Sequence, residues 1–558
     1  MNDRLFRCLR GGLALAFSVA MTNIAITYFD FEKTLWLSGT TPIVMAGLAL
    51  TAFAIFGPIR QNTRRLKFLT VMVCFATLLI VPFIFVNDAF GTKDMGSIMI
   101  TVQENEAGRA LAVGLDGFGK DIGWHLSIIL IVCSAVYVLS RTLPMFRFAA
   151  WAMVGLFLVS NPVSVAAMRM IVPNGAHALI APEVDVHPPV ITGRPTEQKN
   201  LIFVYMESIE RTYRDMPVTA ASFQPLAKIE DRGLSFTGLG QIAGTHFTAG
   251  GLVASQCGVP LLPKGVFNVR KKLREGVDLD LGFENFLGGI ECLGDILVDD
   301  GYNASYMNGS ELSIFAKGDL FKTHKYQRMF GRDSLANPAA EPRQNIWGMD
   351  DDYIFEKAKA EIAYLAAQDK PFLFSMLTIA THGPDAFVDA KCSYPAVGGS
   401  MIPAAIQCTG DHVQALIDEV DRLGLADDTV IIVLSDHLAM KNTLDPSFDA
   451  HTGDRRNYFT VLGAGHQGQI SKLGTTMDIY PTVLELLGYE LVGRRANMGM
   501  SLISTNPTMA QRLSLKQLSK AVDGNSTLQK RLWLDEEANP PLAGVNRPDR
   551  TTATGCCG

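Results

Sequence analysis

The sequence predicts two structural units: an α-helical membrane domain with five spans, followed by an α/β domain that lies in water on the extracytoplasmic side. The chain has 558 residues, of which 48% are hydrophobic, and its mean hydropathy is +0.19. This composition is too apolar on average for an ordinary soluble protein. The apolar residues crowd the first 170 or so positions, whereas the rest has the mixed charge and regular Gly and Pro of a globular domain.

Five stretches are long enough to cross a hydrocarbon core of about 30 Å, and none contains Lys or Arg apart from Arg147 at the start of the fifth. Basic residues precede the first stretch, follow the second and flank the turn between the last two, so the positive-inside rule places the amino terminus in the cytoplasm. An odd number of spans then places everything after about residue 168 outside. A cleaved signal peptide would also explain the basic start, but not the four further stretches. The predicted spans cover residues 11–29, 41–59, 68–86, 123–140 and 146–166.

Three boundaries follow from composition. Residues 1–167 form the predicted membrane domain, and residues 168–199 are rich in Pro, which predicts a stiff, extended linker. Residues 200–504 form the predicted outer domain, and residues 505–558 form a polar tail. The net charge is −6 and no long run of Lys or Arg is present, so a nucleic-acid partner is not expected.

Apolar runs at 201–205, 372–377 and 430–434 predict buried strands, and residues 351–368 and 411–424 predict helices. Ligand sites of open α/β sheets lie beyond the carboxyl ends of the strands. The residues that follow each predicted strand are therefore the candidates for a ligand site.

Polar side chains follow all three predicted strands. Glu207 follows the first, Thr381 and His382 follow the second, and Asp436 and His437 follow the third. Carboxylates together with an imidazole suit a divalent ion such as Mn or Zn. One such carboxylate alone would more often be a helix cap, but the set of three strand ends is harder to explain in this way.

Thr248 lies just before the helix-like run at 252–255. A hydroxyl at a helix amino terminus lies among free backbone N–H groups and a dipole that favours phosphate. Thr248 could instead simply cap the helix, and spacing alone favours that reading.

The predicted outer domain contains an even set of four cysteines. An oxidising compartment permits disulfides, and we expect the nearest neighbours in sequence to pair, although four cysteines allow three connectivities. His and Asp do not interleave the cysteines at zinc-finger spacing, so we do not expect a structural zinc site. The expected pairs are Cys257 with Cys292 and Cys392 with Cys408.

Four ordered motifs resemble the sulfatase and alkaline phosphatase superfamily. Within it they look closest to the bacterial phosphoglycerol transferases that decorate osmoregulated periplasmic glucans, with lipoteichoic acid synthases and phosphoethanolamine transferases as cousins. The resemblance covers about 200–500, and the five-span arrangement also matches. The motifs are NLIFVYMES, GTHFTAGGLVASQCGVPL, SDHLAM and TTMDIYPTVLELLG.

The resemblance implies a sulfatase-like fold for the outer domain and a single divalent metal, with Mn expected first and Zn or Mg as alternatives. Glu207, Asp436 and His437 match the metal ligands of the family, and Thr248 matches its metal-bound nucleophile. His382 resembles the histidine that contacts the head group or the leaving group.

Phe315 and Lys317 match the substrate-binding stretch, where lipoteichoic acid synthases have Trp and Arg. Lys can offset phosphate charge, but it lacks the bidentate fork of Arg. His246 and His451 could add further ligands or contacts, although a solvent-facing loop histidine is the more common outcome.

The implied reaction transfers phosphoglycerol from phosphatidylglycerol to a hydroxyl of a periplasmic glucan through a covalent phosphothreonine intermediate and releases diacylglycerol. The implied location is the bacterial inner membrane, with several spans, contact with bilayer lipid and a periplasmic catalytic domain. A phosphoethanolamine transferase or an enzyme like the lipoteichoic acid synthases would use the same residues. Sulfate ester hydrolysis is disfavoured because the C-x-P-x-R and S-x-P-x-R signatures are absent. An inactive sulfatase-fold protein that binds glycan or lipid is the alternative from a different class.

Overall fold

The computed structural model describes residues 68, 71–72, 184–262, 285–336, 343–345, 347–383, 385–440, 442–451, 453–523 and 525–533. Apart from three helical residues at 68 and 71–72, the five predicted spans lie outside these residues. Among the residues that are described, no helix combines the length and the apolar character needed to cross a membrane.

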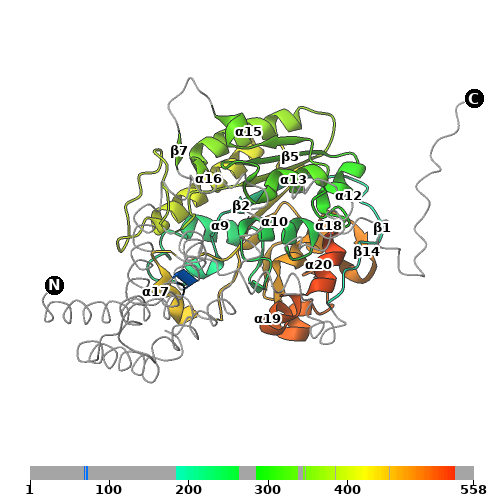
Figure 1. Cartoon of the computed structure of the whole chain (residues 1–558). Coiled ribbons are helices and arrows are strands. Elements are labelled where there is room, and N and C mark those ends of the chain that lie inside the picture. The colour runs from blue at the N-terminus through cyan, green and yellow to red at the C-terminus, as the bar shows by residue number, and fades with distance from the viewer. Residues whose placement is uncertain are drawn as a thin grey trace, which may run out of the picture.

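One large sheet organises the domain (Figure 1). Five of its strands, from β10 through β2, β9 and β5 to β6, run parallel, whereas β11 is antiparallel to β10. The three predicted strands are confirmed as β2, β9 and β10, which are neighbours at the centre of the sheet. Their continuous apolar runs reflect burial on both faces. In spatial order the strands are β12 (Gly468–Ile470), β3 (Leu234–Phe236), β11 (Phe459–Leu462), β10 (Thr429–Ser435), β2 (Asn200–Met206), β9 (Phe372–Leu377), β5 (Asn303–Asn308) and β6 (Arg328–Phe330).

Alternate side chains of β2 point into two different hydrophobic cores. Phe203 packs in one core and Val204 in the other, as the two-residue period of a strand requires. The first core contains residues of α10 (Thr248–Cys257), α12 (Leu293–Asp299), α13 (Lys317–Thr323) and α18 (Ile479–Leu486). The second contains residues of α9 (Gln224–Arg232), α15 (Asp351–Ala366) and α16 (Ile402–Arg422), so helices cover both faces of the sheet.

Short elements complete the described domain. Two-stranded pairs are β4 (Leu239–Gly240) with β13 (Gly474–Thr475), β7 (Gln344–Asn345) with β8 (Gly348–Met349), and β15 (Arg495–Ala496) with β16 (Gly499–Met500). Short α-helices are α14 (Arg332–Leu335) and α17 (Asp445–Phe448), and 3₁₀ turns cover Arg211–Arg214, Ile314–Ala316, Ala426–Asp428, Asp449–His451, Thr476–Asp478 and Val492–Arg494.

The domain begins earlier than residue 200. Within the predicted linker, β1 (Ile191–Gly193) pairs antiparallel with β14 (Glu490–Leu491), and His187 forms a bridge with Asn497. The extended backbone expected from the prolines is therefore used as an edge strand of the domain rather than as a free tether.

The domain also continues past residue 504, through α19 (Met509–Val522) and α20 (Ser526–Trp533). Leu518, Val522 and Leu532 are buried in the first core, and the Trp533 indole Nε1 donates a hydrogen bond of 2.8 Å to the Leu262 carbonyl. The first part of the predicted polar tail is thus two amphipathic helices, which the overall polarity of the segment conceals.

Two disulfides have the pairing expected for sequence neighbours. Cys257, at the end of α10, is bonded to Cys292, which precedes α12. Cys392, in the loop after β9, is bonded to Cys408 in α16.

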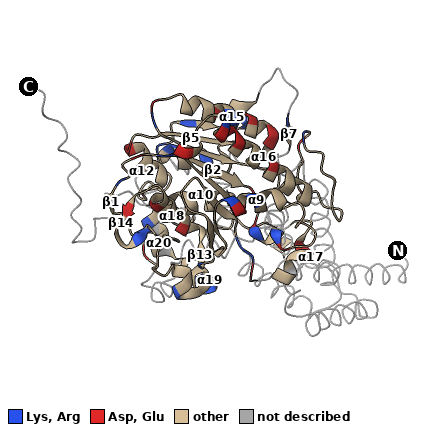
Figure 2. Ribbon diagram, turned by 180° about the vertical axis from the view of Figure 1, so that it is seen from behind, with Lys and Arg blue, Asp and Glu red and all other residues tan. Residues whose placement is uncertain are grey.

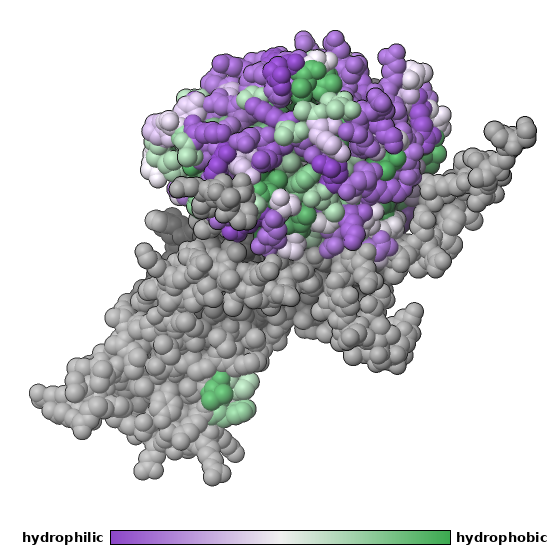
Figure 3. Space-filling view, turned by 90° about the horizontal axis from the view of Figure 1, so that it is seen from above, coloured by the Kyte–Doolittle hydropathy of each residue, from purple (hydrophilic) through white to green (hydrophobic). Residues whose placement is uncertain are grey.

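The described surface has the character of a domain that faces water. Acidic and basic residues are interspersed over the helices, including α15 and α16 (Figure 2). The face seen in Figure 3 is mostly hydrophilic, with small separate hydrophobic areas.

Candidate active site

The ends of two adjacent parallel strands carry three acidic or imidazole side chains. Glu207 follows β2, and Asp436 and His437 follow β10. One potential ligand atom from each of the three lies within 4.8 Å of the others, and all three side chains are buried. The structure therefore brings together the ligand set that the sequence predicts.

Thr248 is the first residue of α10, and its Oγ1 lies 3.3 Å from Oε2 of Glu207. The residue at the N-cap position is Phe247, whose side chain makes no capping hydrogen bond. Thr248 therefore does not cap this helix, and no side chain of the cap residue covers the N–H groups of the first turn. A hydroxyl in this position faces the carboxylate of the ligand set while lying at a helix end that favours anions.

Two buried ligand atoms have no hydrogen-bond partner. Oδ1 of Asp436 accepts hydrogen bonds from the backbone N–H of Ser208 (2.9 Å) and of His437 (2.8 Å), while Oδ2 of Asp436 accepts none. The Nδ1 of His437 contacts the Leu438 carbonyl at 2.9 Å, and Nε2 is unpartnered. Nε2 lies 3.2 Å from that Oδ2 without hydrogen-bond geometry.

Buried polar atoms are almost always hydrogen-bonded, so these two atoms without partners indicate a site for a cation. The carbonyl at Nδ1 selects the imidazole tautomer whose lone pair lies on Nε2, as in metal-binding histidines. Two carboxylates, an imidazole and a hydroxyl fit Mn, Zn or Mg.

The charges of the cluster are unbalanced without a cation. Burial, and then the negative charge of Glu207, raise the pKa of Asp436 well above its ordinary value. Burial alone would raise the pKa of Glu207 too, but the charges of His437 and His382 and a hydrogen bond from Ser208 lower it overall. Burial lowers the pKa of His437 and so favours the neutral, ligating imidazole. A divalent cation would relieve the repulsion between the two buried carboxylates.

His382 lies in the loop after β9 and is held from several directions. Thr381 donates its hydroxyl to the Glu207 carbonyl, and Nδ1 of His382 contacts the Gly383 carbonyl at 2.9 Å. The indole of Trp347 lies over the imidazole, with 3.8 Å between ring centroids. These contacts fix the ring with Nδ1 engaged, so that Nε2 is the nitrogen left for a substrate.

Sequence reasoning missed Asp351, which shapes this loop. Its carboxylate accepts the backbone N–H groups of Ile379 (2.8 Å) and Ala380 (3.1 Å), and burial raises its pKa to about 7. The acidic start of the predicted helix at 351 was a visible signal, but its partners lie on another element.

Lys317 lies buried in the electrostatic field of the site. Its Nζ donates to Ser310 Oγ at 2.7 Å, and Ser310 Oγ donates to Asn308 Oδ1 at 2.6 Å. Burial lowers the pKa of Lys317 to about 8, while the negative charges of Glu207 and Asp436 oppose this shift.

Phe315, two residues before Lys317, has a φ of 58°, and Ala316 has a φ of 57°. This left-handed backbone is unfavourable for residues with a Cβ and is common at functional sites. The Phe315 ring lies 6.1 Å from the ring of Phe247, which directly precedes Thr248. The predicted substrate-binding stretch therefore does lie next to the predicted nucleophile.

The two other histidines differ in position. His246 stacks edge-on against Phe247 at 5.5 Å and contributes positive charge that lowers the pKa of His437. His451 lies in the 3₁₀ turn Asp449–His451 and is not part of the ligand cluster.

A buried ion pair braces the loop after His437, and sequence reasoning also missed it. Arg455 donates through Nε to Oε1 of Glu210 at 3.0 Å, and Oε2 of Glu210 accepts the backbone N–H of Ala439 at 2.8 Å. Glu210 lies three residues after Glu207, just past the motif NLIFVYMES, but nothing in the sequence identifies Arg455 as its partner.

Residues 199–489 match the sequence profile of the protein family described as Sulfatase, and this span is more than half of the chain. The chain belongs to the sulfatase family. Its sequence is 31% identical over 318 residues to proteins named phosphoglycerol transferase I from Escherichia coli (strain 55989 / EAEC) and from Shigella boydii serotype 18 (strain CDC 3083-94 / BS512). Each alignment covers 55% of this chain and 40% of the relative, so the chain matches less than half of the length of these curated relatives.

Two solved structures are also similar to this sulfatase-family chain. One is a protein in the alkaline phosphatase superfamily from Vibrio parahaemolyticus, with a TM-score of 0.45 and 19% identity, covering 59% of this chain and 76% of that one. The other is the lipoteichoic acid synthase LtaP from Listeria monocytogenes, with a TM-score of 0.44 and 13% identity, covering 61% and 96%.

Proposed function

We propose that this chain is a metal-dependent phosphoglycerol transferase that takes the head group from phosphatidylglycerol, holds it on Thr248 and passes it to a hydroxyl of a periplasmic glucan. The observation that carries the proposal is the position of Thr248 Oγ1, which lies 3.3 Å from Glu207 at the start of α10 and beside the orphaned atoms of Asp436 and His437. The relatives named phosphoglycerol transferase I support the choice of head group.

Thr248 would attack the phosphorus of the lipid phosphodiester. A bond forms between Oγ1 and phosphorus, and the bond from phosphorus to the diacylglycerol oxygen breaks. A divalent cation held by Glu207, Asp436 and His437, with Mn as the first candidate, would lower the pKa of the threonine hydroxyl and offset phosphoryl charge. The N–H groups of the first turn of α10 and the ammonium of Lys317 add donors for the phosphoryl oxygens.

His382 supplies the proton that the diacylglycerol alkoxide needs. Since Nδ1 is engaged by the Gly383 carbonyl, the imidazolium form can donate from Nε2 and become neutral. In the second half-reaction the neutral imidazole accepts the proton of the glucan hydroxyl as that oxygen attacks phosphorus and Thr248 leaves. General acid and base assistance of this kind contributes roughly 10²–10⁴-fold.

We also propose that the apolar first 170 or so residues anchor the chain in a bacterial inner membrane, with the catalytic domain in the periplasm. This placement would bring the site to the level of lipid head groups. It follows from the five apolar stretches and their charge alternation.

The test is incubation of the full chain in detergent with Mn and head-group-labelled phosphatidylglycerol or phosphatidylethanolamine, followed by intact mass measurement. A phosphoglycerol-sized adduct from phosphatidylglycerol, absent in Thr248→Ala, is the expected result. An adduct from phosphatidylethanolamine alone would make the chain a phosphoethanolamine transferase. No lipid cleavage and no bound metal would favour an inactive binding protein.

A further inference from the structure

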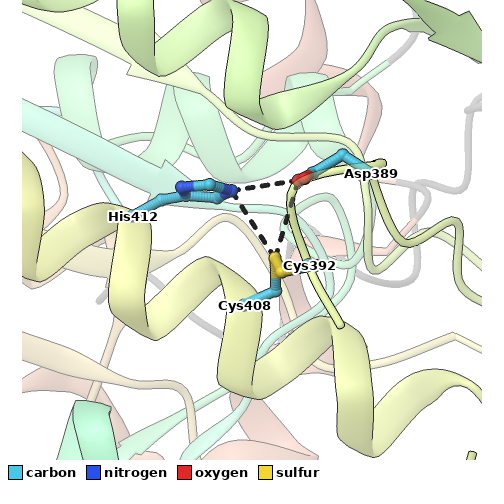
Figure 4. Close-up of side chains that lie close together, drawn as sticks. All are labelled: Asp389, Cys392, Cys408 and His412. Carbon is cyan, nitrogen blue, oxygen red and sulfur yellow. Dashed lines mark hydrogen bonds and ion pairs between the residues drawn. A yellow bond between two sulfur atoms is a disulfide. The ribbon is translucent and has the colours of Figure 1, made fainter. Parts of the chain in front are cut away.

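Four side chains with metal-binding atoms, none of them in the cluster of Glu207, Asp436 and His437, meet in one place (Figure 4). Asp389 and Cys392 come from the loop that follows β9 and His382, and Cys408 and His412 come from α16. Cys408 and His412 lie four residues apart, which places both on one face of the helix. One ligand atom of each of the four residues lies within 4.8 Å of the others.

Three of these atoms are spaced like the ligands of one zinc ion. Sγ of Cys408 lies 3.5 Å from Nε2 of His412 and 3.6 Å from Oδ2 of Asp389. Zinc–sulfur bonds of about 2.3 Å and zinc–nitrogen or zinc–oxygen bonds of about 2.0–2.1 Å at tetrahedral angles give ligand separations of about 3.5 Å. The remaining contact, from His412 Nε2 to Asp389 Oδ2, is a 2.9 Å ion-pair distance that an ion would widen slightly.

Two of the donors, Asp389 and His412, are held in place by neighbouring groups. Oδ1 of Asp389 accepts the backbone N–H of Lys391 at 3.1 Å, so Oδ2 is the oxygen that faces Cys408 and His412. The His412 imidazole stacks on Phe355 with 5.3 Å between centroids, which fixes its plane. Asp389 and Cys408 are buried, so a carboxylate and a thiolate together at these positions would need compensating positive charge.

Among the described residues, the other disulfide, between Cys257 and Cys292, lacks a histidine that could bind an ion. Cys257 and Cys292 also lie near a histidine, His324, but both imidazole nitrogens of His324 are engaged, Nδ1 by Asp295 (2.7 Å) and Nε2 by the Phe286 carbonyl (3.1 Å). That histidine has no nitrogen left for an ion.

We propose that the dithiol form of this domain binds one zinc ion through Asp389, Cys392, Cys408 and His412, at a structural site separate from the catalytic cation. The sequence contains the spacings D-x₂-C and C-x₃-H, in which Asp389 and His412 flank the two cysteines instead of lying between them as in a zinc finger. The ion and the disulfide are alternative ways to hold the loop carrying His382 against α16.

The two forms interconvert by a balanced exchange. A small-molecule or protein disulfide accepts two electrons from the two zinc-bound thiolates, takes up two protons and leaves as two thiols. The bond between Cys392 and Cys408 forms, and the zinc ion is released because a disulfide offers no thiolate ligand.

The experiment compares the full chain in detergent before and after treatment with a phosphine reductant, both incubated with Zn²⁺ and freed of excess ion. Elemental analysis should find one more zinc per chain in the reduced sample. Co²⁺ in place of Zn²⁺ should give a sulfur-to-cobalt charge-transfer band and the visible bands of a tetrahedral site. Absence of the additional zinc, or a cobalt spectrum without the sulfur band, would overturn the proposal.

Matched variants locate the ion without relying on activity. Cys392→Ser with Cys408→Ser should abolish the additional zinc, whereas Cys257→Ser with Cys292→Ser should retain it. His412→Gln removes one ligand but still allows the disulfide to form in the oxidised protein. After reduction, this variant should bind zinc more weakly than the wild type, by more than the roughly 10–100-fold that loss of an outer-shell partner costs. Additional zinc that survives in the Cys392 and Cys408 double variant would refute the assignment.

Discussion

A Cβ atom built on Gly251 would lie 1.8 Å from the main-chain carbonyl oxygen of Asp436. Gly251 lies one turn into α10, the helix that begins with Thr248, and Asp436 is the first residue after β10. The absence of a side chain at this position lets the helix that begins with Thr248 approach the backbone that follows β10. The separation between Thr248 and the cluster of Glu207, Asp436 and His437 therefore depends on a contact between two backbones.

We predict that Gly251→Ala displaces the start of α10 from β10. A shift on the order of 1 Å at a reacting centre can cost roughly 100-fold in rate, so we expect at least that loss in lipid cleavage, together with weaker metal binding measured by calorimetry. Gly233→Ala, just after α9, is the control, because its Cβ would meet the Val461 carbonyl oxygen at 2.7 Å, outside the clusters of potential ligands. The control should lose stability but keep its metal affinity; equal metal affinity in both variants would contradict the prediction.

Thr248→Ala should lower lipid cleavage by about 10⁴–10⁶-fold, as removal of nucleophiles does in other covalent enzymes. Thr248→Ser keeps a hydroxyl in place and should still form the adduct, at a reduced rate. Ser255→Ala, on the same helix but bonded to the Gly251 carbonyl and Tyr205, should form the adduct normally. Intact mass after incubation with labelled lipid distinguishes the three variants, and an adduct on Thr248→Ala would disprove the assigned role.

Removal of the metal should destabilise the wild-type domain. A ligand at 100 times its Kd stabilises the folded state by about 2.7 kcal/mol, so a chelator should lower the Tm by several degrees. Glu207→Gln and Asp436→Asn should lose this response. The control Glu361→Gln breaks a 2.7 Å contact with Arg328 outside the ligand cluster, and its Tm should still depend on metal.

Lys317→Met should stabilise the metal-free protein near neutral pH while reducing its activity. The folded state lowers the pKa of Lys317 from the ordinary 10.5 to about 8. Between these two pH values Lys317 is protonated in the unfolded state but neutral in the folded state, so the free energy of unfolding rises with pH. Below pH 8 the buried charge of Lys317 should lower the free energy of unfolding of the wild type by about 1–3 kcal/mol relative to Lys317→Met. This range allows for the hydrogen bond to Ser310 that the variant loses.

Denaturant unfolding of chelated protein from pH 7 to pH 10.5 measures this difference. The stability of the wild type should rise toward that of Lys317→Met as the pH increases, and Lys317→Arg should remain destabilised throughout. If the free energies of unfolding of the wild type and Lys317→Met change in parallel with pH, the charge of Lys317 does not destabilise the folded state.

The sequence was most informative where a local pattern determines structure. The apolar runs 201–205, 372–377 and 430–434 predicted the central strands, and the rule for the carboxyl ends of strands brought Glu207, His382 and the Asp436 motif to one edge. The disulfide partners also followed from proximity in sequence.

The contacts that sequence reasoning missed join residues that are distant in sequence. The bond between Asp351 and the backbone at Ile379, and the pair of Glu210 with Arg455, depend on which helix or loop packs beside which strand. The helices after residue 504 were missed for another reason, because average polarity hides apolar positions that are regularly spaced along one face.

Glu207, Thr248 and Asp436 follow or begin three elements, and they meet only when β10 lies beside β2 and α10 packs against this part of the sheet. If the proposed function holds, the ability to cleave lipid would therefore appear only once the sheet is complete, and a misfolded chain would be inactive.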